Sequence, residues 1–162
     1  MRLPAAPLVA LVAVALSGCG TQAAEKPVEE GQRANSACSP SIREIANRFK
    51  ALFYDQGRVR EAYETYVAED YIQHNPMAQD GRDAAIAFLE PIYQRNPQHR
   101  MKVHRMIVED PYIVVHLHGQ SSPEDLGAAA VDILRVENCK IVEHWDVTQP
   151  VPAESVNENG MF

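Results

Sequence analysis

The chain has 162 residues, of which 46% are hydrophobic and 23% are charged, a balance typical of one globular domain rather than of a disordered chain. Its formal net charge is -7 at pH 7 and no basic stripe runs along it, which excludes nucleic acid as the expected partner.

Residues 1–19 have the pattern of an export signal. Arg2 precedes an apolar run from Leu8 to Leu16, which is too short to cross a bilayer, because a spanning helix needs about 20 apolar residues. The run ends in Leu16-Ser17-Gly18-Cys19, which resembles the lipobox of bacterial lipoproteins. We therefore expect a lipid anchor at Cys19, with ordinary signal cleavage nearby as the alternative.

Either form of processing predicts an extracytoplasmic location in the cell envelope. In a Gram-negative cell, Gly20-Thr21 after the cysteine lacks the aspartate associated with inner-membrane retention. This favours an anchor in the outer membrane, facing the periplasm. Residues 20–37 have no aromatic residue and no periodicity, so they are expected to form a flexible tether.

The folded domain is predicted to span residues 38–150, and it begins with three amphipathic helices. Ser41 and Glu44 fit a capping box, and apolar residues then recur at helical spacing as far as Phe53. A second helix is expected from Val59, with Val67 as the last residue of its apolar face, and a third from about Gly81 to Arg95. Between these two, residues 71–76 are expected to be extended, because Pro76 disfavours helical angles in the residue before it.

After the third helix the apolar period changes to that of strands. Segments rich in β-branched residues cover 101–108, 112–120, 128–136 and 140–147, with turn residues between them. Helices followed by a strand meander predict an α+β fold, in which a curved antiparallel sheet wraps around the helices as a cone with an open mouth. Residues 151–162 are expected to form a loose tail.

Two cysteines remain if Cys19 is lipidated. Cys38 and Cys139 are then disulfide candidates in an oxidising compartment, and the bridge would join the start of the first helix to the tip of the last hairpin. The same pairing would explain why Cys139 occupies a turn position where glycine would be expected. Two unrelated free thiols are the alternative.

The last hairpin carries the residues most suited to acid/base chemistry. If Glu137-Asn138-Cys139 is a three-residue loop, Asp132 lies opposite His144, and both share one face of the sheet with Asp146. Two carboxylates and an imidazole that line a desolvated cone could serve as general acid and base. A change of register by one residue would instead pair different faces.

Further polar residues are expected in the same pocket. His104, His116 and His118 share parity if the preceding hairpin also has a three-residue loop, and Gln73 and His74 are expected near the mouth. The pair His116 and His118 is conceivable as metal ligands. The usual ligand spacings are absent, so we expect no metal and no cofactor.

The opposite face of the last hairpin is predicted to be an apolar outer patch with charged flanks. An exposed patch of this kind usually marks a subunit interface, which favours a homodimer over a substrate-binding role for Trp145. The residues assigned to it are Val131, Ile133, Arg135, Ile141, Glu143 and Trp145.

Three stretches of the sequence carry a resemblance to a known family: YIQHNP (71–76), DGRDAAIAFL (80–89) and VDILRVENCKIVEHWDV (131–147). They resemble the SnoaL-like proteins, which have the nuclear transport factor 2 fold and include polyketide cyclases. The resemblance implies a cone-shaped α+β barrel that usually dimerises through its sheet. It also implies that Asp146 acts as acid/base, with Asp132 in the place of the family's histidine.

The sequence therefore supports three hypotheses. The first is a SnoaL-like acid/base enzyme, of aldol/cyclase or isomerase type, acting on a small hydrophobic carbonyl compound through Asp146, Asp132 and His144. The second is a binding module that holds a hydrophobic ligand in the same cone without chemistry. The third is a structural, dimeric envelope lipoprotein.

Overall fold

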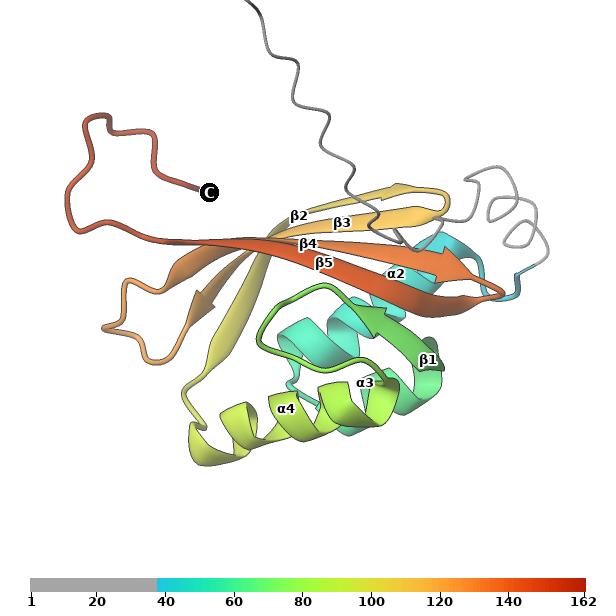
Figure 1. The fold of residues 1–162 in the computed structure, drawn as a ribbon. Helices are drawn as coiled ribbons and strands as arrows, with labels where there is room; N and C mark the ends of the chain where they lie inside the picture. Colours follow the sequence, from blue (N-terminus) through green and yellow to red (C-terminus); the bar gives the residue numbers. More distant parts are fainter. Residues whose placement is uncertain (1–37) are drawn as a thin grey trace, which may run out of the picture.

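The computed structural model describes residues 38–162, so the signal 1–19, the lipidation site Cys19 and the tether 20–37 lie outside the described residues. Figure 1 shows the helices gathered against one face of a curved sheet, which confirms the predicted α+β architecture. The helical elements are α2 (Ile42–Lys50), the π-helical turn η1 (Ala51–Asp55), α3 (Val59–Tyr66) and α4 (Arg82–Arg95). The strands are β1 (Val67–Gln73), β2 (Arg100–Glu109), β3 (Tyr112–Gln120), β4 (Ala128–Glu137) and β5 (Lys140–Pro150).

Helix α2 begins with the capping box that the sequence predicts. The backbone N–H of Ser41 donates to the Glu44 carboxylate at 3.0 Å, and the Glu44 N–H donates to the Ser41 hydroxyl. Its core-facing side includes Ile45 and Phe49, which are 1% and 2% exposed. Among residues 38–162, no helix is both long enough and apolar enough to cross a membrane.

The sheet has the strand order β1-β5-β4-β3-β2. Strands β2 to β5 form the predicted antiparallel meander, whereas β1 adds a parallel edge strand next to β5. The sequence pattern had assigned Val67 to the end of the second helix, but Val67 opens β1 and is 1% exposed. Pairing with the free edge of β5 therefore outweighs the local helical pattern.

The predicted disulfide between Cys38 and Cys139 is present, with a Cα–Cα distance of 5.3 Å. It ties the segment before α2 to the turn of the β4–β5 hairpin. That turn has two residues, Asn138 and Cys139, with φ angles of 51° and 64°. Positive φ at both positions is what a two-residue hairpin turn of type I′ requires, so the expectation of a three-residue loop was wrong.

A bulge shifts the register of this hairpin. Val136 pairs with Ile141 and Arg135 with Glu143, which leaves Val142 as the extra residue. As a consequence, Asp132 lies opposite Asp146 rather than opposite His144. The assignment of Ile141 to the outer patch was also wrong, since Ile141 is 0% exposed and belongs to the core.

Candidate functional site

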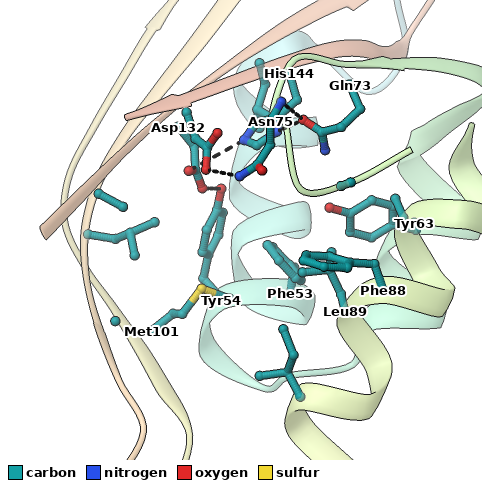
Figure 2. Close-up of a pocket in the computed structure, with 18 of the residues that line it drawn as sticks. Phe53, Tyr54, Tyr63, Gln73, Asn75, Phe88, Leu89, Met101, Asp132 and His144 are labelled. Carbon is teal, nitrogen blue, oxygen red and sulfur yellow. Dashed lines mark hydrogen bonds and ion pairs between the residues drawn. The ribbon is translucent and has the colours of Figure 1, made fainter. Parts of the chain in front are cut away.

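A cavity of about 260 Å³ lies between the concave face of the sheet and the helices. Its volume is close to the lower end of the range for small-molecule sites. Figure 2 shows that apolar and aromatic side chains surround most of it, while polar groups gather at one end. The labelled apolar residues are Phe53, Phe88, Leu89 and Met101, and the polar end holds Asp132, His144, Gln73 and Asn75.

Asp132 of β4 reaches the cavity and is held there by Tyr54. The Tyr54 hydroxyl donates to Asp132 Oδ2 at 2.6 Å, and Figure 2 shows the phenol pointing up at the carboxylate. Tyr54 comes from the π-helical turn η1 and is 4% exposed. The consecutive residues Phe53 and Tyr54 of this turn both face the core.

His144 of β5 lies between Asp132 and Gln73. Its Nδ1 is 2.9 Å from the side-chain oxygen of Gln73, and its Nε2 is 3.5 Å from Asp132 Oδ1. The same Gln73 oxygen accepts the backbone N–H of Asn75 at 2.9 Å, which fixes the orientation of the amide. An oxygen can only accept, so His144 donates through Nδ1 and its Nε2 faces Asp132.

Asp132 and His144 therefore face each other in the cavity wall, with the imidazole held by Gln73 and the carboxylate held by Tyr54. A carboxyl group and an imidazole are the side chains most often used as general acid and base.

Asp146 completes the polar end of the cavity. Its Oδ2 accepts a hydrogen bond from Asn75 Nδ2 at 2.7 Å. The side-chain oxygen of Asn75 accepts the backbone N–H of Met77 at 2.8 Å, so the amide nitrogen is the atom that faces the carboxylate. Asp132, His144 and Asp146 thus lie together along the cavity wall.

Three buried tyrosines surround the Asp132 carboxylate. Burial is the main cause that raises the pKa of Tyr54, Tyr63 and Tyr71, and the nearby charge of Asp132 raises each of them further. These phenols therefore stay neutral in the folded protein, and the Tyr54 hydroxyl keeps the proton that it donates to Asp132. His99 also lines the cavity, and burial lowers its pKa.

The structure does not bring all the predicted residues to this site. Gln73 lines the cavity, but His74 lies on the outer face, where its ring stacks on Trp145 with centroids 4.7 Å apart. Its assignment to the pocket was wrong, because successive residues of an extended chain point to opposite faces.

The three histidines of β2 and β3 are also outside the pocket. Strand β3 places Leu117 in the cavity wall, so His116 and His118 point to the outer face. There the ring of Phe162 stacks on His104 and His118, with centroids 4.6 and 4.3 Å apart. The end of the predicted loose tail is therefore packed against the sheet. Within residues 38–162, no group of three or more His, Cys, Asp or Glu side chains is placed to hold a metal ion.

Most residues of the predicted outer patch do lie on the outer side of the last hairpin. Arg135 pairs with Glu143 at 2.6 Å and with Glu137 at 3.0 Å. Trp145 lies under the His74 ring. Val131 and Ile133 alternate along β4 with Asp132 and Leu134, which line the cavity.

Tyr54 and Asn75 are the site residues that the sequence reasoning missed. The signal for Asn75 was available, because Gln73 and Asn75 have the same parity in an extended segment and His74 has the other. No comparable signal exists for Tyr54, since its place in the site is defined by the contact with Asp132, 78 residues further along the chain.

Comparison with known proteins gives one family match. The family described as SnoaL-like polyketide cyclase matches residues 44–155, which is more than half of the chain. A search of curated proteins gives no significant match.

Solved structures with the same fold are numerous. A proposed polyketide cyclase from Bacillus cereus superposes with a TM-score of 0.56 at 20% identity, over 70% of this chain and 79% of the other. A proposed isomerase of the SnoaL-like family from Agrobacterium tumefaciens gives 0.54 at 18% identity, over 66% and 96%. An NTF2-like protein from Cytophaga hutchinsonii gives 0.55 at 16% identity, over 67% and 89%. At these identities the likeness shows the fold alone.

Proposed function

The chain belongs to the SnoaL-like polyketide cyclase family, and from this premise we propose that it is an acid/base enzyme acting on a small hydrophobic carbonyl compound. The observation that carries the proposal is the contact between His144 Nε2 and Asp132 Oδ1 at 3.5 Å in the cavity wall, beside the second carboxylate of Asp146. Cofactor-independent chemistry next to a carbonyl needs a base for the carbon and a proton donor for the oxygen.

We assign the base to Asp146 and the donor to the Asp132–His144 pair. Asp146 takes a proton from the carbon next to the carbonyl, the C–H electron pair becomes the enol double bond, and the pair protonates the carbonyl oxygen. An isomerase would return a proton to another carbon, whereas an aldol or cyclase reaction would let the enol carbon attack a second carbonyl. The described residues that line the cavity include no lysine or arginine, which supports an uncharged substrate over an anion.

The test measures enol formation directly, with 2-tetralone as the probe because it is a small hydrophobic ketone. The protein should catalyse exchange of the α-protons of 2-tetralone with D₂O, followed by NMR. Asp146→Asn and Asp132→Asn should each slow this exchange roughly a hundred- to ten-thousandfold, the usual contribution of general acid/base catalysis. His116→Ala is the matched control, because it removes an imidazole from the outer face of the sheet.

The outcomes separate the candidate functions. Exchange that is equally fast in Asp146→Asn and the wild-type protein would contradict the proposed base. Binding of 2-tetralone without exchange would favour a ligand-binding module with the same cavity. If the ketone neither binds nor exchanges, the result would contradict the proposed acid/base activity on small ketones. It would then favour the structural envelope role.

We also propose that the protein works outside the cytoplasm as a lipoprotein anchored at Cys19, in the outer membrane facing the periplasm if the cell is Gram-negative. The Cys38–Cys139 disulfide supports an oxidising compartment. A homodimer through the outer face of the sheet is proposed in addition. Exposed apolar residues on the sheet favour it, since Ile107 and Val147 are 62% and 71% exposed.

A further inference from the structure

Two three-residue segments lie side by side at the edge of the sheet and alternate in the same way. Residues 73–75 run parallel to residues 144–146, with Gln73 in register with His144 and the His74 N–H donating to the His144 carbonyl at 2.9 Å. Each residue of the first segment contacts its counterpart in the second. The first and third pairs face the cavity, and the middle pair, His74 and Trp145, faces outward.

The two cavity-facing pairs are the ones that orient the proposed catalytic groups. Gln73 fixes which nitrogen of His144 carries the proton, and Asn75 holds the Asp146 carboxylate. Both amides project from the segment 73–75, which continues β1 into a turn. Their positions therefore depend on how firmly this segment is held against β5.

The middle pair, His74 and Trp145, fixes the segment 73–75 against β5. The His74 and Trp145 rings are 4.7 Å apart and nearly parallel, at 7°. His74 Nε2 lies 2.8 Å from Glu143 Oε1, and the other oxygen of Glu143 contacts Arg135 at 2.6 Å. The Glu143 and Arg135 side chains are only 10% and 13% exposed, so the ion pair that binds His74 is itself held in place by its surroundings.

We propose that His74 is a positioning residue for the site: clamped between Trp145 and Glu143 on the outer face, it holds Gln73 and Asn75 in the places that orient His144 and Asp146. The catalytic meaning of this role rests on the proposed function, but the positioning itself does not. His74 touches no group in the cavity and acts only through its two neighbours in the chain.

The test follows the Nδ1 proton of His144 by NMR of the ¹⁵N-labelled protein. In His74→Ala, exchange of this proton with water should accelerate about tenfold, which is the effect of losing one hydrogen bond to a charged group. His74→Phe keeps a ring against Trp145 and His74→Gln keeps a donor for Glu143, so both should fall between His74→Ala and the wild-type protein. The backbone amide of Leu117, in β3, should exchange at an unchanged rate in all three variants.

Two results would overturn the inference. One is an Nδ1 proton of His144 that exchanges equally fast in all variants and in the control His116→Ala. The other is equal acceleration at His144 and at Leu117, which would mean general loss of stability rather than positioning. If the His144 proton responds but the wild-type protein does not exchange 2-tetralone, the proposed function fails while the positioning role of His74 stands.

Discussion

The β4–β5 hairpin and the β2–β3 hairpin look alike in sequence and differ in what they do with their polar residues. Both carry histidine on strands rich in β-branched residues, three in β2–β3 and one in β4–β5. In β4–β5 the inward face combines core residues such as Leu134 with Asp132 and His144. In β2–β3 the inward positions are apolar, and His116 and His118 face outward against Phe162.

The difference shows that a histidine on a strand is informative only in relation to its apolar neighbours. Ile113, Val115 and Leu117 are 1%, 0% and 3% exposed, so their side chains face the core. The histidines that alternate with them therefore face the other side of β3. In β4 and β5, polar residues share a face with buried ones. Placing a carboxylate there costs stability, and such a cost is characteristic of functional sites.

The largest expected effect on this comparison comes from removing the disulfide, which is attached to the β4–β5 hairpin and not to the β2–β3 hairpin. Replacing both Cys38 and Cys139 by serine should lower the free energy of unfolding by about 4 kcal/mol, because the bridge closes a loop of about a hundred residues. Urea unfolding of the two proteins measures the difference. Addition of a reductant should destabilise the wild-type protein by a similar amount and leave the double variant unchanged.

If the hairpin carries the site, this double variant should also lose more 2-tetralone exchange than its unfolded fraction explains. Equal loss of exchange and of folded protein would instead show that the bridge only stabilises the fold.

A second test compares two neighbouring residues of β3. Leu117→Ala removes a side chain that is 3% exposed, and it should cost about 3 kcal/mol of stability. His116→Ala should cost less than about 1 kcal/mol, since this ring lies on the outer face, where it contacts Phe162 and Arg105. Chemical denaturation of both variants measures the contrast. Similar losses would contradict the assignment of the two faces.

The sequence predicted the three helical segments, the four antiparallel strands that follow them, the capping box of α2 and the disulfide, because each follows from local spacing or from pairing two cysteines. It could not predict the bulge at Val142, which moves Ile141 into the core and sets Asp132 opposite Asp146. The parallel strand β1 and the orientation of Tyr54 were equally inaccessible. Both depend on contacts between segments far apart in the chain.

The smallest expected effect concerns the three buried tyrosines near Asp132 of β4. The folded-state pKa values of Tyr54, Tyr63 and Tyr71 are raised above the ordinary value of about 10, so their contribution to stability is complete below about pH 10 and is lost as the pH rises further. Asp132→Asn removes the charge but not the burial. The three pKa values should therefore fall only partway towards the ordinary value, so phenolate should form at a lower pH in Asp132→Asn than in the wild-type protein.

Ultraviolet absorbance of phenolate gives the titration of these tyrosines. Asp125→Asn is the matched control, because Asp125 is bonded within the loop between β3 and β4, to Ser121 and Gly127. It should leave the alkaline titration of the tyrosines unchanged. If Asp132→Asn leaves it unchanged as well, the Asp132 carboxylate is not the charge that the phenols sense, and the contrast between the two hairpins would then rest on burial alone.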